Sequence, residues 1–354
     1  MAQIHSRSSS GSANYPSRRD FLRRAGLTAG GLLTLTAPNL FGKWVDHAVA
    51  ADQRTYVAGK FALELDGQAA GFGYSVEGGA AVGEVAIIAM GANQIPNKQL
   101  TNLRYEPIAV EFGAGMSKAW YDWISSTLDM KIQPRNGAVL SLDFNNVEQS
   151  RLNFMNALIT EITFPALDAA SKDAARMTVK LAPAGTQQKS GSKAVVGGMS
   201  LKQKQWLPAN FRLFIQGLEQ ATKRVNKLEA LTIKFKTQSD QVGKFREAQK
   251  EPVVIEIPNL IFTIPEIDAG PFYQWHEDFV IKGNNGPDRE RPGVLEWLTP
   301  AVVTGPTVLG SLQFFNLGIF KIAPEKLEAG ADTIRRVKVE MYCERIAAAF
   351  PGFV

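Results

Sequence analysis

Few residues in this chain belong to the types that perform acid–base or nucleophilic chemistry. Of the three histidines, only His276 lies beyond the first fifty residues, and Cys343 is the single cysteine. His276 is followed by two acidic residues in a short predicted helix, a pattern that favours a solvated polar face over a catalytic base. A lone cysteine excludes an intrachain disulfide and a cysteine-built metal site. In a predicted strand it is interpreted as a small buried hydrophobic side chain rather than a nucleophile.

Carboxylates offer the remaining route to chemistry, because glycoside cleavage needs two of them facing each other. The candidates are Asp143, Glu148, Asp168, Asp288 and Glu290. Their spacing gives no reason to pair any two. Metalloprotease, nucleophile-elbow and P-loop motifs are absent, and Gly71-Phe72-Gly73 lacks the third glycine and helix of a dinucleotide site. The sequence therefore predicts a protein that is not an enzyme, with no catalytic, cofactor-binding or metal-binding residues.

Composition places the chain among soluble globular proteins. It has 354 residues, of which 45% are hydrophobic and 21% charged. The 31 glycines and 18 prolines favour strands and turns over a helical bundle. The net charge of +5 comes mostly from residues 1–50, which hold six basic side chains against two acidic ones. The nearly neutral remainder gives no support for specific nucleic-acid recognition.

Residues 1–50 resemble an export leader. The twin-arginine motif comprises Ser17, Arg18, Arg19, Phe21 and Leu22. A weakly apolar segment from Ala25 to Leu40 follows and is too short and glycine-rich to span a membrane. Ala48 and Ala50 form a small-residue cleavage site before Ala51. We predict export by the twin-arginine route, to the periplasm or the extracellular space; the alternative is a disordered basic tail with a chance arginine pair.

Five segments of the chain recur in the same order, 145 to 160 residues later. The pairs are Phe61–Gly67 with Phe211–Gly217, Arg104–Phe112 with Glu251–Ile257, Trp120–Trp123 with Phe272–Trp275, Phe154–Ile159 with Phe314–Ile319, and Arg176–Leu181 with Arg336–Met341. Ordered matches with little drift predict one fold copied in tandem. The predicted domains are residues 56–183 and 209–354, joined by a glycine-, serine- and lysine-containing linker over residues 184–208.

Hydrophobic periodicity predicts the elements that must position these residues. Apolar residues alternate in Phe61–Leu65 and Ile108–Phe112, as in half-buried strands. Residues at spacings of three and four predict one helix in each half. The apolar faces are Met116, Ala119, Trp120, Trp123, Ile124 and Leu128 in the first, and Phe272, Trp275, Phe279 and Val280 in the second. The tryptophans are interpreted as core rather than as a ligand platform. Gly71–Asn97 is predicted to be an extended, sparsely packed arm.

Residues Phe61 to Leu181 resemble the phage tail-tube protein family of contractile tails and related injection systems. The resemblance rests on a Phe-x-Leu-x-Leu-Asp-Gly opening, a glycine-rich segment, the strand ending in Phe112, a helix with two tryptophans, and three later strands. Those strands are Val139–Asp143, Phe154–Ala157 and Met177–Leu181. The second half is similar to a divergent copy with a shorter helix.

The resemblance implies a mainly β fold, a β-sandwich or barrel with one flanking helix per repeat. In this family, six such domains close a ring by pairing edge strands, and rings stack into a tube. Two domains per chain then predict a trimer with pseudo-six-fold symmetry. Expected partners are further copies of the chain and other tail or injection-system components, and no cofactor is expected. The predicted contact regions are Gly71–Asn97 and Gln220–Lys250.

Two further possibilities remain open at this stage. An exported binding or scaffold protein that kept the fold would be monomeric or dimeric, with an exposed aromatic patch. A tail-like particle in the cytoplasm or in a virion would account for the family resemblance without export.

Overall fold

The computed structural model describes residues 59–90, 95–196, 206–240, 249–300, 305–326 and 334–353. The chain divides into two units, Met1–Thr55 and Tyr56–Val354, and all of the described residues belong to the second. The predicted twin-arginine motif and the cleavage residues Ala48 and Ala50 lie outside the described residues.

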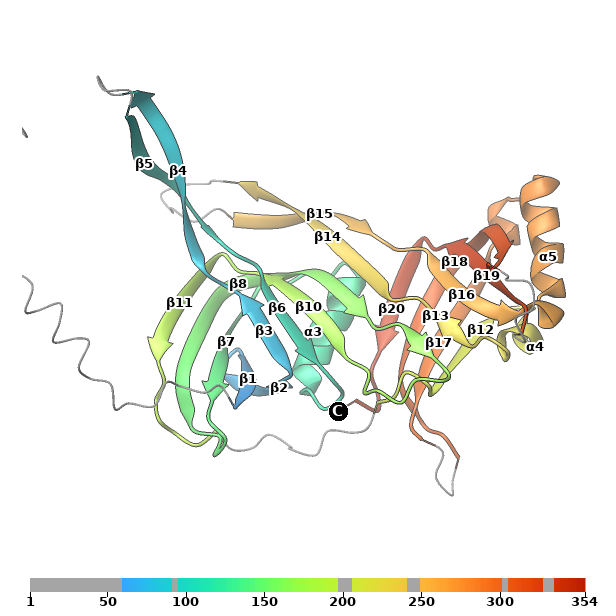
Figure 1. Cartoon of the computed structure of the whole chain (residues 1–354), viewed down its shortest axis with the longest axis horizontal. Coiled ribbons are helices and arrows are strands. Elements are labelled where there is room, and N and C mark those ends of the chain that lie inside the picture. Colours follow the sequence, from blue (N-terminus) through green and yellow to red (C-terminus); the bar gives the residue numbers. More distant parts are fainter. Residues whose placement is uncertain are drawn as a thin grey trace, which may run out of the picture. The chain divides into compact units, whose positions relative to one another are not determined.

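The first half contains eleven strands and one helix among its described residues (Figure 1). The strands are β1 (Lys60–Leu65), β2 (Gln68–Gly73), β3 (Ser75–Gly78), β4 (Ala81–Met90), β5 (Pro96–Tyr105), β6 (Ile108–Phe112), β7 (Arg135–Leu142), β8 (Glu148–Phe164), β9 (Leu167–Asp168), β10 (Met177–Ala182) and β11 (Gly185–Ser190). The helix is α3 (Lys118–Leu128). Strand β11 lies within the segment predicted as a linker.

The second half has a similar order of elements. Its strands are β12 (Phe211–Ile215), β13 (Lys227–Leu228), β14 (Leu231–Asp240), β15 (Gln249–Glu256), β16 (Leu260–Pro265), β17 (Arg291–Leu298), β18 (Val308–Pro324), β19 (Arg336–Tyr342) and β20 (Arg345–Ala349). Its helical segments are α4 (Glu219–Thr222), η1 (Glu266–Asp268), α5 (Gly270–His276), the π-helical η2 (Glu277–Ile281) and η3 (Pro287–Arg289). The predicted mainly β fold class is confirmed. No helix in the described part of the chain is long and apolar enough to cross a membrane.

Alternation in the sequence explains the strands. Val337, Val339 and Met341 of β19 are fully buried, and the residues between them are partly exposed. The same alternation holds in β6, where Ile108, Val110 and Phe112 are buried. Each such strand therefore covers the core with one face, as the period of two predicts.

Helix α3 begins after Ser117, whose hydroxyl accepts a hydrogen bond from the Trp120 amide and so caps the helix. Trp120 and Trp123 are buried and meet edge to face, which confirms that they belong to the core. Ala119 was predicted on the apolar face but is exposed. In the second half, Val280 is also exposed (43%), because the π-helical η2 turns it away from the buried side formed by Phe272 and Trp275.

Two large sheets carry the fold. The first follows the order β2-β1-β7-β8-β10-β6-β3, and β11 and β14 also pair with β8. The second follows β12-β17-β18-β19-β16-β13-β9, with β20 paired to β18. Strands β8 and β18 have 17 residues each, and each pairs with different neighbours along its two halves. Each sheet therefore folds around its long strand into a barrel-like layer.

The left-handed conformation of one asparagine marks the change of neighbours in each long strand. Asn156 in β8 has φ 47°, and Asn316 in β18 has φ 56°. Asparagine tolerates this conformation better than most other residues, so it can bend a strand without a break in the chain.

Strands from the two halves mix in both sheets. Strand β14 of the second half pairs with β8, and β9 of the first half pairs with β13. One large cluster of buried hydrophobic side chains runs through both halves. The described residues of the two halves therefore share a core.

Candidate functional site

The structure places the five candidate carboxylates in separate local networks. Asp143 accepts hydrogen bonds from the Asn145 and Val147 amides of its own turn. The other four bind a side chain that is not a carboxylate. Their partners are Arg151 and Ser192 for Glu148, Lys227 for Asp168, Arg289 for Asp288 and Tyr342 for Glu290. No contact in the described chain brings two of them together for acid–base work.

The thiol and the imidazole have no catalytic partner in the described part of the molecule. The Cys343 thiol donates to the carbonyl oxygens of Phe315 and Arg345, and burial raises its pKa to about 11. A thiol with this pKa is a poor nucleophile at neutral pH. His276 ends helix α5. The described residues contain no group of three or more His, Cys, Asp and Glu side chains that could hold a metal ion.

What the structure offers instead is a set of surfaces that join strands. The first is the seam between the halves, where β14 lies antiparallel to β8. Its four residue pairs are Leu231↔Phe164, Thr232↔Thr163, Ile233↔Ile162 and Lys234↔Glu161. Leu231, Phe164 and both isoleucines are buried. The hydroxyls of Thr163 and Thr232 are 3.1 Å apart and share a hydrogen bond.

The seam continues through β13 and β9. Lys227 pairs with Asp168 across these strands, with 3.3 Å between Nζ and Oδ2, and Leu228 pairs with Leu167. Both leucines are buried. The Ala170 amide and Lys227 together lower the pKa of the Asp168 carboxyl. The halves are therefore joined by backbone pairing, apolar contact and charge along one continuous line.

The segment that follows β20 makes a further contact between the two halves. Phe350 and Phe353 follow β20, and both rings lie against Tyr121 of helix α3, with centroids 4.9 Å and 5.4 Å away. The Phe353 ring also meets Trp206 at 5.0 Å, edge to face, and its carbonyl accepts from the Gly115 amide. Sequence periodicity did not predict this cluster, although the aromatic residues of the Phe350-Pro351-Gly352-Phe353 ending were its available signal.

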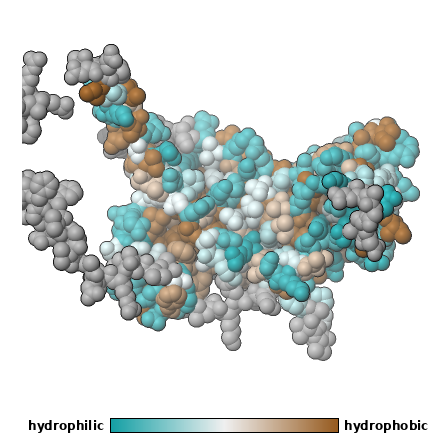
Figure 2. Space-filling model, in the orientation of Figure 1, coloured by the Kyte–Doolittle hydropathy of each residue, from teal (hydrophilic) through white to brown (hydrophobic). Residues whose placement is uncertain are grey.

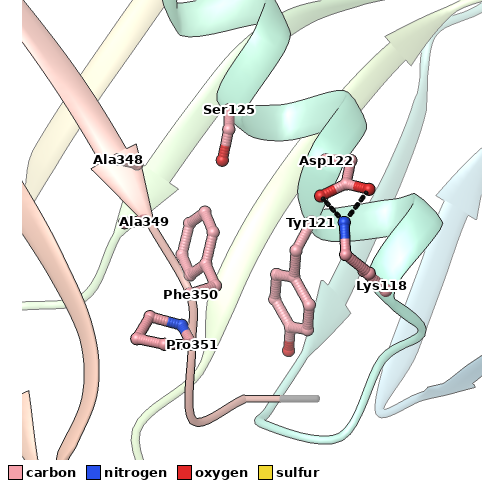
Figure 3. Close-up of a pocket in the computed structure, with 8 residues that line it drawn as sticks. All are labelled: Lys118, Tyr121, Asp122, Ser125, Ala348, Ala349, Phe350 and Pro351. Atoms are coloured by element: carbon pink, nitrogen blue, oxygen red, sulfur yellow. Dashed lines mark hydrogen bonds and ion pairs between the residues drawn. The ribbon is translucent and has the colours of Figure 1, made fainter.

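A cavity of about 490 Å³ opens between α3 and the tail (Figure 3). The residues that line it include Ser125 on the helix and Ala348 and Ala349 on β20. Lys118 and Asp122 form an ion pair at its rim, 2.6 Å apart, and the rings of Tyr121 and Phe350 face each other below them. Its charged side chains already pair with each other. We therefore interpret the cavity as space left where the helix packs against the strand, and not as a ligand-binding site.

An apolar arm is the second surface. Among the strands that the structure describes, β4 and β5 pair only with each other, and they extend away from the sheets (Figure 1). Large apolar side chains on the arm are more than 60% exposed, and Figure 2 shows hydrophobic residues gathered there. They are Val85, Ile87, Ile88, Ile95 and Leu100. Solvated hairpins rarely carry so many large apolar side chains, so this arm has the character of a contact surface.

Strands β14 and β15 form a second hairpin, which is attached to the body. Its outer part exposes Val253 and Val254 beside the Lys236–Glu256 ion pair. Lys250 donates to the Pro183 carbonyl at 3.1 Å, and burial lowers the pKa of its ammonium group. The predicted contact regions, Gly71–Asn97 and Gln220–Lys250, overlap the two hairpins only in part, because the first also contains β3 and the second also contains β13.

An unpaired strand edge is the third surface. Within the described residues, β8 pairs with β7, β10, β11 and β14, whereas β18 pairs with β17, β19 and β20. The C-terminal part of β18, from Phe320 to Pro324, has β19 on one side. Strand β4 likewise pairs with β5 alone, while β14 pairs with both β15 and β8. An open edge of this kind is a template for another strand.

Comparison with protein families gives one match. Residues 57–187 match the family of the T4-like virus tail tube protein gp19. The match covers the segment whose motifs carried the predicted resemblance, so that resemblance is confirmed. A comparison with curated proteins finds no match.

Several solved structures are similar to this chain at low identity. The sheath/tube terminator of an extracellular contractile injection system, PVC, has 18% identity and a TM-score of 0.35, covering 40% of this chain and all of that one. The tube-terminating cap of the anti-feeding prophage has 16% identity and a TM-score of 0.35, covering 45% and 100%. Hcp1 from Flavobacterium johnsoniae has 16% identity and a TM-score of 0.26, covering 37% and 96%.

Proposed function

We propose that this protein is a structural, ring- or tube-forming protein of the tail-tube type. The observation that carries the proposal is the pairing of β14 with β8, in which one half of the chain extends the sheet of the other. A contact that extends a sheet from one domain to the next can be repeated between chains, and closure leaves no strand edge open. The family match over residues 57–187 supports the same reading.

The two halves are proposed to be tandem copies, and the strand registers support this. Arg135 pairs with Ala157 and Arg291 with Leu317, and each pair precedes a register shift. After the shift, Gly137 pairs with Phe154, and Gly293 pairs with Phe314. The same residue types at the same step of the same ladder are hard to explain without duplication.

One sequence match needs a different alignment under this proposal. Ile108 of β6 pairs with Leu181, while Leu260 of β16 pairs with Met341, the counterpart of Leu181. Arg104–Phe112 then corresponds to Glu256–Ile264 instead of Glu251–Ile257. The hairpins agree, because Val82 pairs with Arg104 and Lys234 with Glu256.

Three chains with two domains each would make a ring of six domains with pseudo-six-fold symmetry. The role is geometric, so the protein is proposed to be non-enzymatic and to need no cofactor. Its partners are further copies of itself and other components of a tail-like or injection-like assembly. The predicted twin-arginine motif places that assembly outside the cytoplasmic membrane, as a proposal that rests on the sequence alone.

Negative-stain electron microscopy of the chain from Ala51 onward tests this function, together with native mass spectrometry. We expect rings or tubes with a central pore and a trimeric mass. A hexameric mass without trimers would contradict the pseudo-six-fold arrangement but not the tube. Dispersed monomers or dimers at micromolar concentration would contradict assembly and favour the alternative, an exported binding or scaffold protein that kept the fold.

A further inference from the structure

The β14–β8 seam inside one chain can serve as the template for a contact between two chains. This inference rests on the proposed function. Strand β14 of the second half covers the edge of β8. If the two halves are tandem copies, β4 of the first half is equivalent to β14 of the second, and β8 of the first half is equivalent to β18 of the second. Strand β4 and the C-terminal part of β18 are the two strands that lack this partner in the described chain. A second copy that repeated the β14–β8 contact would give each of these two edges the partner that β8 already has.

We infer that β4 of one copy pairs antiparallel with the C-terminal part of β18 of the next copy, in the register of the internal seam. The register follows residue by residue from the four pairs of β14 and β8. The predicted pairs are Ala80 with Ala323, Ala81 with Ile322, and Val82 with Lys321. The fourth pair of the seam has no counterpart here, because Gly79 is buried and its carbonyl accepts a hydrogen bond from the Thr186 hydroxyl of its own chain.

The chemistry of these pairs fits an edge-to-edge contact. Ala80 is exposed and Ala323 is half-buried. In this register neither residue faces a bulky or like-charged side chain on the opposite strand. Pro324, at the end of the strand, is tolerated because proline is confined to edges and strand ends. Lys321 already pairs with Glu340 at 2.6 Å, so its charge stays compensated when Val82 lies opposite.

A second contact follows from the same template. Within the chain, Tyr121 of α3 is buried by the tail that follows β20. Its counterpart Tyr273 on α5 is 38% exposed, and Val280 and Ile281 of η2 are exposed beside it. Strand β11 corresponds to β20, because Gly185 pairs with Met155 as Arg345 pairs with Phe315. Strand β11 of the next copy would therefore cover α5 and η2.

This second contact carries charge complementarity. Ser125 and Ala349 line the cavity between α3 and β20 together. Their counterparts are Glu277 on η2 and Lys189 on β11, both exposed. Glu277 has Lys282 as a neighbour within its own chain at 3.0 Å, and both side chains remain more than half exposed. Lys189 of one copy and Glu277 of the next are thus placed as an ion pair.

Engineered disulfides test the register directly in the full mature chain carrying Cys343→Ser. Thr163→Cys with Thr232→Cys is the positive control, because those hydroxyls are 3.1 Å apart and should give a disulfide within one chain. Ala80→Cys with Ala323→Cys should give covalent oligomers on a non-reducing gel, ending at a trimer. Ala81→Cys with Ala323→Cys should stay monomeric, because a slip of one residue turns the side chain to the other face.

The outcomes separate this inference from the proposed function. Rings without covalent oligomers of the Ala80→Cys/Ala323→Cys chain would overturn the register and leave the ring intact. A chain that neither assembles nor cross-links overturns both. Cross-linked ladders that pass the trimer would keep the register and contradict the three-chain ring.

Charge reversal tests the second contact independently. Lys189→Glu or Glu277→Lys alone should raise the concentration for half-assembly by about ten-fold, and the two together should restore it. Lys282→Glu with Lys189→Glu is the matched control and should not restore assembly. Equal assembly of all these variants would overturn the ion pair.

Discussion

At the scale of single residues, Arg151 is held between two carboxylates on different strands. Its guanidinium lies 2.9 Å from Glu64 of β1 and 2.9 Å from Glu148 of β8. Glu148 is almost fully buried and also accepts from the Ser192 hydroxyl at 2.5 Å. Burial alone would raise the pKa of Glu148, but the Ser192 hydroxyl and the Arg151 guanidinium outweigh it and lower the pKa below its ordinary value. The network joins β1, β8 and the segment after β11.

Glu148→Gln should destabilise the fold by about 1–3 kcal/mol at pH 7, because the charge-assisted hydrogen bonds are lost. Since the folded pKa is lowered, the stabilisation by Glu148 is complete above the ordinary carboxyl pKa of about 4.3 and disappears as the pH falls through the folded value. Urea unfolding at pH 7 and below pH 4 measures this. The difference between variant and parent should shrink at the lower pH. Glu77→Gln, on the exposed strand β3, should change stability by less than about 0.5 kcal/mol at both pH values.

At the scale of elements, each long strand pairs with a strand that has a glycine at the register shift. The glycine is Gly137 in β7, which pairs with β8, and Gly293 in β17, which pairs with β18. A Cβ on Gly137 would clash with the Glu64 carbonyl oxygen and the Phe154 ring. At the equivalent place in the second half, a Cβ on Gly293 would lie 2.8 Å from Leu317 and 3.0 Å from the Phe214 carbonyl. Both glycines therefore let the carbonyl of a neighbouring strand approach the backbone, together with the Phe154 ring at Gly137 and the Leu317 side chain at Gly293.

Gly137→Ala and Gly293→Ala should each lower the free energy of unfolding by about 1–3 kcal/mol, because overpacking forces the strands apart. The effect should be larger at Gly137, where the added Cβ would lie much closer to the Glu64 carbonyl oxygen than the 3.0 Å that would separate it from the Phe214 carbonyl oxygen at Gly293. Gly270→Ala is a suitable control, since nothing lies within 4 Å of its Cβ position. Chemical denaturation measures all three. Equal stability of Gly137→Ala and Gly270→Ala would mean that the ladder adjusts freely there.

The arm formed by β4 and β5 contributes little to the fold of its own chain, because its apolar side chains are exposed. Ile87→Asp, at a residue 63% exposed, should leave the free energy of unfolding unchanged within about 0.5 kcal/mol. The same variant should assemble less well if the arm contacts a neighbour, since an unpaired charge then enters an apolar interface. Lys98→Gln on the paired strand is the control. Analytical ultracentrifugation compares the sizes, and normal assembly of Ile87→Asp would exclude Ile87 from the interface.

At the scale of the whole molecule, the two halves are joined by a common core. The Phe353 ring is fully buried against Tyr121 of the first half and against Trp297 of the second. The Phe164 ring of the first half stacks on the same tryptophan, with centroids 5.4 Å apart. The halves are therefore expected to unfold together.

Phe353→Ala should reduce the free energy of unfolding by about 3–5 kcal/mol, as truncation of a buried aromatic ring usually does. Differential scanning calorimetry should show a single transition in the parent chain, because a shared core couples the halves. Ile267→Ala, at a residue 91% exposed, should leave the transition temperature nearly unchanged. Two separate transitions in the parent chain would contradict a shared core.

Local pattern was enough to predict most of the elements. The alternation in Phe61–Leu65 and the spacing of Trp120 and Trp123 predicted a strand and a helix that the structure contains. Such patterns work because the period of side chains along a strand or helix is a property of the local backbone. The burial of Tyr121 was not predictable in this way, since it depends on the distant residues Phe350 and Phe353 that cover it. The exposure of Val280 was missed because the pattern assumed a regular helix where the structure has the π-helical η2.

The sequence by itself determined the mainly β fold class, one main helix in each half, and the resemblance of the first half to tail-tube proteins. It also contains the ordered matches on which the proposed duplication rests. Only the tertiary structure decided that β14 joins β8, that the tail after β20 packs against α3, and that no other described strand pairs with the second edge of β4 or of the C-terminal part of β18. The physical reason is that pairing between strands far apart in sequence is selected by packing of the whole core, which no local period specifies.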